Sequence, residues 1–211
     1  MRLNRRSLLA AMPGLAATPA LAQAEVFPAR PLRMIVPFAP GGPLDILGRP
    51  IAERLSALLG QTVIFENKPG ANGIVATQMV AQARPDGYLL LLTTGSFAGN
   101  IAFNSQQLTF DPLKDIAPLT LVADGTGMTL VGSTKLPAQN MAELAAYARS
   151  KPGGLSCATT GYGNITHLAA EQFKKYVGAE LVQVPMHGTA PSVTELLAGN
   201  IDLTFSTIPP I

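Results

Sequence analysis

Short apolar runs alternate with longer amphipathic runs along this chain. In the first half they predict strands and helices in turn: strands at Leu32–Val36, 62–66 and 88–92, and helices at 44–59 and 72–83. The run Leu32–Val36 is apolar except for Arg33, which is typical of a parallel strand covered on both faces. Gly60 is expected to end the first helix. The polar stretch 93–114 is expected to be irregular.

The second half repeats this alternation. It predicts strands at 116–122, 128–131, 155–158, 181–185 and 201–206, and helices at 141–150, 166–177 and 190–198. Asn140, with Glu143 three residues later, has the spacing of a capping box. The glycine-rich stretch 124–127 suggests a crossing between two α/β lobes, the first at 25–125 and the second at 126–211. Such alternation predicts mostly parallel sheets.

Four loops follow predicted strands and lead toward helices. They are 37–45, 93–100, 159–167 and 185–191. Ligands of open parallel sheets bind beyond the carboxyl ends of the strands, where helix N-termini present unpaired N–H groups. We therefore expect an anion site, in a cleft between the lobes, built from main-chain amides and neutral side chains. The candidate residues are Pro40, Gly41, Gly42, Asp45, Thr94, Gly95, Ser96, Asn100, Thr160, Gly161, Asn164, Thr166, His167, His187, Gly188 and Thr189.

Several candidates have a second interpretation. Asp45 would repel a carboxylate at close range, so a role in capping its helix or in accepting a hydrogen bond from water or a ligand hydroxyl is the alternative. Asn164 or Thr166 can cap the helix that follows. His167 has no neighbouring metal ligand and can simply pack in the first helical turn, and His187 can be an exposed loop residue.

The N-terminus resembles an export signal. Arg2, Arg5 and Arg6 precede a broken apolar run that ends in a small-residue cleavage site near Ala24, so residues 1–24 are interpreted as the signal. The apolar run is too short to span a bilayer, which takes about 20 residues. The pair Arg5-Arg6 fits a twin-arginine signal as well as an ordinary secretory signal, and both remain open. Either route places the mature chain outside the cytoplasm, in the periplasm.

Composition narrows the class of partner. The 211-residue chain has a formal charge of +2, from 15 Lys and Arg against 13 Asp and Glu. Loss of the three signal arginines would leave 12 basic residues and a net charge of about −1. No long basic run remains, which argues against nucleic acid as a partner. The single cysteine, Cys157, excludes a disulfide within the chain.

Particular motifs resemble the extracytoplasmic receptors of tripartite tricarboxylate transporters, often called Bug receptors. The matching segments are collinear: Pro31–Asp45 with its Pro-Gly-Gly turn, Glu66–Gly73, Pro85–Tyr88, Phe110–Asp115, Leu136–Ala138, Thr166–Ala169 and Val184–Thr189. This resemblance implies a type II periplasmic-binding-protein fold in which two lobes close on a small carboxylate. It also implies about a hundred further residues, so the second lobe is expected to be incomplete and the chain truncated.

The resemblance has departures and leaves alternatives. The family's usual Tyr-Lys-Gly-Ser is Met186-His187-Gly188-Thr189 here, and Ser206 or Thr207 replaces a common acidic residue. The implied function is a receptor, without cofactor or metal, that delivers a carboxylate to a membrane permease. A periplasmic sensor for a signalling partner is the alternative. A thiol enzyme using Cys157 and His167 is the third reading, but no nucleophile elbow, metal-ligand pair or phosphate loop supports it.

Overall fold

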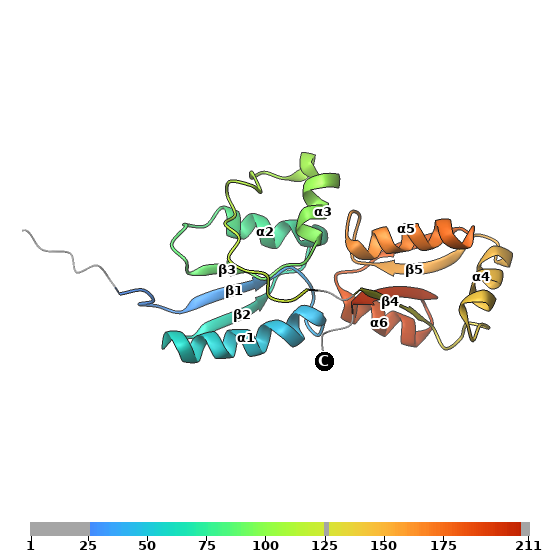
Figure 1. Cartoon of the computed structure of the whole chain (residues 1–211), viewed down its shortest axis with the longest axis horizontal. Coiled ribbons are helices and arrows are strands. Elements are labelled where there is room, and N and C mark those ends of the chain that lie inside the picture. The colour runs from blue at the N-terminus through green and yellow to red at the C-terminus, as the bar shows by residue number, and fades with distance from the viewer. Residues whose placement is uncertain (1–25, 125–126, 208–211) are drawn as a thin grey trace, which may run out of the picture.

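Two separate sheets, each with helices packed against it, form two lobes that lie side by side (Figure 1). The structure is a computed structural model that describes residues 26–124 and 127–207. The predicted export signal, residues 1–24, lies outside the described residues, and so do residues 125 and 126 at the predicted lobe boundary. Both therefore stay predictions. Among the described residues, no helix combines the length and apolar character needed to cross a bilayer.

The first lobe is a parallel three-stranded sheet in the order β2-β1-β3. Its elements are β1 (Leu32–Val36), α1 (Pro43–Leu59), β2 (Val63–Asn67), the 3₁₀ turn η1 (Ala71–Gly73), α2 (Ile74–Ala81), β3 (Leu89–Leu91), α3 (Ser96–Phe103) and the 3₁₀ turn η2 (Ser105–Gln107). The apolar strand β1 is central, and Ile35 and Val36 are fully buried. This confirms the expectation of a strand covered on both faces.

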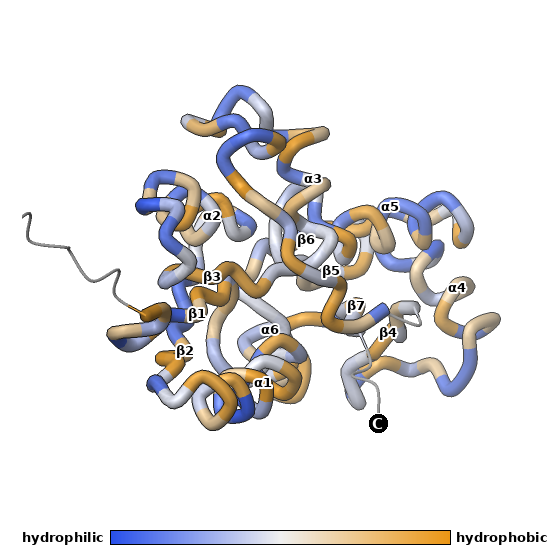
Figure 2. Tube along the Cα trace, turned by 60° about the vertical axis from the view of Figure 1, so that its left-hand side comes forward, coloured by the Kyte–Doolittle hydropathy of each residue, from blue (hydrophilic) through white to orange (hydrophobic). Residues whose placement is uncertain are grey.

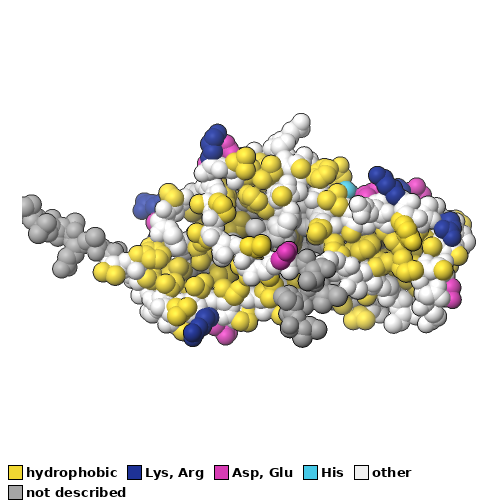
Figure 3. Space-filling model, viewed as in Figure 1, with side chains coloured by type: hydrophobic (Ala, Val, Ile, Leu, Met, Phe, Trp, Pro, Cys, Tyr) yellow, Lys and Arg dark blue, Asp and Glu magenta, His cyan; other side chains and the backbone are white. Residues whose placement is uncertain are grey.

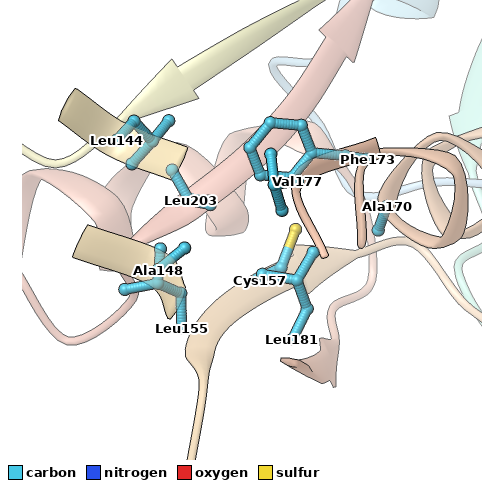
Figure 4. Close-up of a cluster of buried hydrophobic side chains, with 9 residues drawn as sticks. All are labelled: Leu144, Ala148, Leu155, Cys157, Ala170, Phe173, Val177, Leu181 and Leu203. Atoms are coloured by element: carbon cyan, nitrogen blue, oxygen red, sulfur yellow. The ribbon is translucent and has the colours of Figure 1, made fainter. Parts of the chain in front are cut away.

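The second lobe is a four-stranded sheet in the order β4-β7-β5-β6. Its elements are β4 (Met128–Gly132), α4 (Met141–Ser150), β5 (Leu155–Thr159), α5 (Ile165–Val177), β6 (Leu181–Pro185), α6 (Thr189–Ala198) and β7 (Leu203–Thr207). Strands β5, β6 and β7 are parallel, whereas β4 runs antiparallel to β7. Leu155, Cys157 and Leu203 are fully buried in its core beneath Phe173 of α5 (Figure 4).

Local signals fix several helix ends as predicted. Gly60 ends α1 in the left-handed conformation, with φ 66°. At the start of α4, the N–H of Glu143 donates to Asn140 Oδ1 at 3.0 Å, and the Glu143 carboxylate accepts from the N–H of Gln139 at 2.7 Å. The capping box is therefore confirmed. Its carboxylate reaches a backbone N–H one residue before the cap.

Two predictions for the connection between the lobes are wrong. The stretch 93–114 is not wholly irregular, because α3 and η2 lie within it. The apolar run 116–122 forms no strand, and its residues Leu119, Leu121 and Val122 are exposed. A strand needs a partner that supplies its ladder hydrogen bonds, and no described strand pairs with this run. Figure 2 shows apolar stretches along this connection, between α3 and β4.

Candidate functional site

A cavity of about 70 Å³ lies where the two lobes face each other. Its walls are Phe38, Ala39, Gly42, Pro43, Leu44, Asp45, Thr94, Thr160, Asn164, Ile165, Thr166, Thr189 and Thr207. These residues follow the ends of strands in both sheets and include the first residues of α1, α5 and α6. Parallel strands bring their carboxyl ends to one edge, which explains why loops distant in sequence meet here.

The first-lobe wall is the turn between β1 and α1. Gly41 adopts φ 86°, a conformation that side-chain-bearing residues rarely adopt, and Gly42 is the N-cap of α1 without any side-chain cap. Pro43 takes the first helical position, where its missing N–H costs nothing. Within the described part of the chain, the N–H of Leu44 forms no hydrogen bond. This helix start therefore presents a free donor beside the cavity.

Asp45 lines the cavity, but its carboxylate is already engaged. Oδ2 accepts from Arg49 Nη2 at 2.8 Å, and Oδ1 accepts from Asn67 Nδ2 at 2.8 Å. The same Asn67 amide donates to the carbonyl of Phe38 at 3.0 Å, so Asp45 holds the turn against β2. The alternative of a helix cap is wrong, because the start of α1 has no side-chain cap. Its pairing with Arg49 reduces the repulsion that an anionic ligand would meet.

The second-lobe wall is a network of hydroxyl and amide groups at the start of α5. Asn164 caps the helix by accepting from the N–H of Thr166 at 3.1 Å, which confirms one of the two predicted roles. Thr166 Oγ1 accepts from the N–H of Thr160 at 2.9 Å and lies 3.0 Å from Thr160 Oγ1. The two hydroxyls share a single short contact. Thr166 Oγ1 also donates to Asn164 Oδ1 at 3.2 Å, so the Thr160 hydroxyl donates to Thr166 and both protons are engaged within this network.

Two further hydroxyls and another helix start complete the walls. Thr94 Oγ1 donates to Ser96 Oγ at 3.0 Å just before α3, which leaves Thr94 facing the cavity and Ser96 buried behind it. Thr189 is the first residue of α6, and within the described residues its N–H forms no hydrogen bond. Asp45 is the one charged residue among the described lining residues. The other polar side chains of the lining are neutral, and apolar residues make up the rest of the walls.

The predicted residues separate into two groups. Those that line the cavity are Gly42, Asp45, Thr94, Thr160, Asn164, Thr166 and Thr189. Those that lie in the same loops but do not line it are Pro40, Gly41, Gly95, Ser96, Asn100, Gly161, His167, His187 and Gly188. His167 packs edge-on against Tyr162, with ring centroids 4.6 Å apart, and its buried Nδ1 has no hydrogen-bond partner among the described residues. His187 is exposed, and its carbonyl accepts from the N–H of Ala39 at 2.9 Å.

Sequence reasoning missed some of the lining. Phe38, Ala39, Pro43, Leu44, Ile165 and Thr207 also line the cavity. All of them except Thr207 have side chains without a polar group, so their residue type did not mark them as candidates. Thr207 could have been found, since it is the last residue of a strand whose carboxyl end points to the site.

The enzyme reading would need a metal centre or an activated thiol near the cavity. No cluster of three or more His, Cys, Asp or Glu suited to a metal occurs among the described residues. Cys157 is fully buried in the core of the second lobe, and this burial raises the pKa of its thiol to about 12. A nucleophilic cysteine needs the opposite, an accessible thiol with a lowered pKa.

A larger hollow lies elsewhere, on the second lobe. It has a volume of about 600 Å³ and is lined by Met128, Leu130, Met141, Ile165, Leu168, Ala169, Gln172, Phe173, Tyr176 and Phe205. Gln172 is the only lining residue with an amide, and none of these described residues is charged. Gln172 and Tyr176 are the only side-chain donors among the described lining residues of this largely apolar groove, and no helix start lines it except Ile165 and Met141, so its size does not make it the better candidate.

Comparison with known proteins places the chain among solute receptors. Residues 47–211 match the model of the tripartite tricarboxylate transporter family receptor. A UPF0065 protein of Bordetella pertussis is 38% identical over 189 residues, which cover 89% of this chain and 57% of that protein. Two solved structures are also similar. MatC of Rhodopseudomonas palustris with bound malate has 30% identity and a TM-score of 0.78. An R. palustris protein with adipate has 33% identity and a TM-score of 0.80.

The matched segments make up a larger share of this chain than of its relatives. The matches to the malate and adipate structures cover 86% and 87% of this chain, and 61% of each of those chains. The chain thus spans about three fifths of the length of the proteins it resembles. The match to the family model begins at residue 47, within α1, so β1 and the β1–α1 turn precede it.

Proposed function

The chain belongs to the tripartite tricarboxylate transporter receptor family, and from this premise we propose that it captures a small dicarboxylate in the cavity between its lobes. Members of this family are solute receptors rather than enzymes. The ligand would be held by main-chain amides at the starts of α1, α5 and α6, helped by threonine hydroxyls.

The observation that carries this proposal is the meeting of three helix N-termini at one cavity. The helices contain 17, 13 and 10 residues, so each has a full dipole with its positive end at the lining residues. Each such end favours an anion by about 0.3–1 kcal/mol, and by more where it is partly buried. Charge-assisted hydrogen bonds to free N–H groups add to this. Together they support micromolar binding, about −8 kcal/mol.

The size of the cavity favours a short acid. Pockets for drug-sized ligands are about 300–1,000 Å³, whereas this cavity is about 70 Å³. The relatives with malate and with adipate show that the family accommodates diacids of different length. In the arrangement described here, we expect a four-carbon diacid to be preferred over a six-carbon one.

Delivery to a membrane permease is the second half of the proposal. The family's name supports this partner, as does the sequence pattern of an export signal at residues 1–24. A moderate affinity suits such a role, because the ligand must be released to the permease. We expect the mature chain to act in the periplasm.

The test is ligand binding by the full chain without its signal, measured by isothermal titration calorimetry. Malate should bind, while its uncharged diamide, which has the same length, should not. Adipate should bind more weakly than malate. Binding of the diamide as tight as that of malate would exclude a site that depends on the carboxylate charge.

A pair of variants at Thr189 tests the role of the main chain. Thr189→Val removes only the hydroxyl, whereas Thr189→Pro also removes the N–H at a helix position where proline is well tolerated. We expect Thr189→Pro to weaken malate binding about 10-fold beyond Thr189→Val, since a charge-assisted hydrogen bond contributes about 1.5–3 kcal/mol. Equal affinities of the two variants would contradict a main-chain anion site.

A further inference from the structure

The two lobes touch at two places, one on each side of the cavity. Within the described residues the chain passes from the first sheet to the second once, so noncovalent contacts contribute to how the lobes are oriented. One contact joins the β1–α1 turn to the start of α6, where the N–H of Ala39 donates to the carbonyl of His187. The other is a group of asparagines, three buried and one half-buried, which we call the asparagine cluster: Asn72, Asn100, Asn104 and Asn164, with the carbonyl of Tyr162.

The asparagine cluster is held by amide hydrogen bonds across the lobe interface. Asn164 Nδ2 of the second lobe donates to Asn72 Oδ1 of the first lobe at 2.8 Å. In return, the Tyr162 carbonyl accepts from Asn72 Nδ2 and from Asn104 Nδ2, each at 3.1 Å. Asn100 stays within the first lobe and ties Asn72 to α3 by two bonds of 2.9 Å. Three interlobe hydrogen bonds thus converge on one point.

The backbones approach closely at the same place. Asn72 adopts φ 54°, in the left-handed region that asparagine tolerates better than most residues. A Cβ on Gly161 would lie 3.0 Å from the Cβ of Asn72. On Gly99, in the middle of α3, it would lie 2.0 Å from the Gly163 carbonyl oxygen of the other lobe. The lobes can therefore reach this distance only because Gly99 has no side chain.

The asparagine cluster is also connected to the cavity. Asn164 uses its amide nitrogen to bind Asn72 and its Oδ1 to cap α5 at Thr166. Both Asn164 and Thr166 line the cavity. Asn164 is 3% exposed and Asn104 is 9% exposed, whereas Asn72 is half-buried, so water competes little at Asn164 and Asn104 and more at Asn72. No buried amide atom of the cluster lacks a partner among the described residues.

We propose that the asparagine cluster is an interlobe latch, which holds the lobes in the closed arrangement without ligand. It consists of neutral amides, so closure does not depend on a bound acid to neutralise opposing charges. Asn164 is then a positioning residue. It bonds to Asn72 of the first lobe and caps α5, so the position of the helix start beside the ligand depends on whether the lobes are closed. The latch would gate entry and release of the ligand, a role that rests on the proposed function. The proposal that the lobes stay closed without ligand is independent of the proposed function.

The experiment measures the distance between lobes in the full chain without ligand. Nitroxide labels at Arg54→Cys on α1 and Lys175→Cys on α5, both exposed positions, report this distance by double electron–electron resonance. The native Cys157 is buried, and burial raises the pKa of its thiol to about 12, so it does not compete for the label. The wild-type latch should give one narrow distribution at the spacing of the structure.

Two variants should open the latch by different means. Gly99→Ala favours helix α3 intrinsically but places a methyl group against the Gly163 carbonyl. Asn72→Gly keeps the left-handed backbone and removes the amide. Both should shift the distribution to longer distances and broaden it. Asn140→Gly, at the cap of α4 outside the interface, is the matched control and should leave it unchanged.

The outcomes separate the latch from the receptor proposal. A broad ligand-free distribution in the wild-type background, or an unchanged distribution in both variants, would overturn the latch. If Gly99→Ala fails to fold, Asn72→Gly decides alone. Failure of malate to bind would refute the receptor proposal and leave the ligand-free distances as they are. If both proposals hold, the variants should also bind malate more weakly, because only the closed fraction engages both walls.

Discussion

Asp202 shows how one residue ties the second lobe together. It lies between α6 and β7, and its Oδ2 accepts from Lys151 Nζ at 2.9 Å and from both the N–H and Oγ of Ser156 at 2.8 Å. The N–H of Asp202 in turn donates to Ser156 Oγ. Burial by itself would raise the pKa of Asp202, but the hydrogen bonds from Lys151 and Ser156 outweigh it and hold that pKa below its ordinary value.

This residue predicts a pH-dependent stability. A carboxyl group with a lowered folded-state pKa contributes stability above its unfolded pKa, about 3.9, and loses it as the pH falls through the folded value. Asp202→Asn should lower the free energy of unfolding by about 2 kcal/mol near neutral pH. The difference from wild type should shrink below about pH 4, where the wild-type carboxylate also becomes protonated. Urea titrations at both pH values measure it, and a difference that persists in acid would contradict this account.

At the scale of elements, periodicity located most strands and helices because each is fixed by its own apolar face. Leu32–Val36 is an example: four of its five residues are apolar and buried, and only Arg33 is partly exposed. Helix α3 was missed because its sequence contains Gly99 and Asn100, which disfavour helix, and here both serve the interlobe contact. For residues 116–122 the error was the opposite one, because an element was predicted that does not form. Their pattern specifies a strand, but pairing depends on a partner that local sequence does not reveal.

The candidate site was predictable at the level of loops and less so at the level of side chains. The strand–loop–helix pattern located the loops that supply Gly42, Thr94, Thr160 and Thr189. It could not separate Asn164, which lines the cavity, from Asn100, which is buried in the asparagine cluster. That distinction depends on how the lobes are placed relative to each other, which is a tertiary property.

Helix α1 gives an element-scale prediction of two substitutions with opposite effects. Replacing glycine by alanine within a helix ordinarily stabilises it by about 1 kcal/mol. At Gly48, however, the new Cβ would lie 2.4 Å from Leu92 Cδ2 and 2.5 Å from Phe65 Cε2. Gly48→Ala should therefore destabilise the first lobe by about 1–3 kcal/mol. Pro50→Ala, at an exposed position of the same helix, restores a backbone N–H and should raise the melting temperature.

Calorimetry of the two variants beside wild type provides the measurement. Stabilisation by Gly48→Ala would mean that helix propensity outweighs packing against β2 and Leu92. A neutral Pro50→Ala would mean that α1 has already adapted its backbone to the proline. The first result would contradict the close packing described at Gly48, and the second would contradict the predicted gain from a restored N–H.

At the scale of the whole molecule, several large apolar side chains are exposed on the surface. Leu113, Leu119, Leu121 and Tyr176 are about four-fifths exposed. Figure 3 shows hydrophobic side chains gathered on one face of both lobes, with charged side chains toward the margins. Within the described residues, β3 and β4 each end a sheet, so backbone groups of both strands are also available for pairing. Contiguous apolar surface beside open sheet edges favours association.

This surface predicts concentration-dependent self-association of the full chain, detectable by sedimentation velocity and by binding of an anilinonaphthalene dye. The double variant Leu119→Lys, Leu121→Lys should reduce both, because it places charge on the exposed apolar run between the lobes. The matched control is Leu58→Lys with Leu197→Lys, which changes two exposed leucines on α1 and α6 by the same number of charges. If the control reduced association equally, net charge rather than the run 116–122 would be responsible, and the association would have no defined surface.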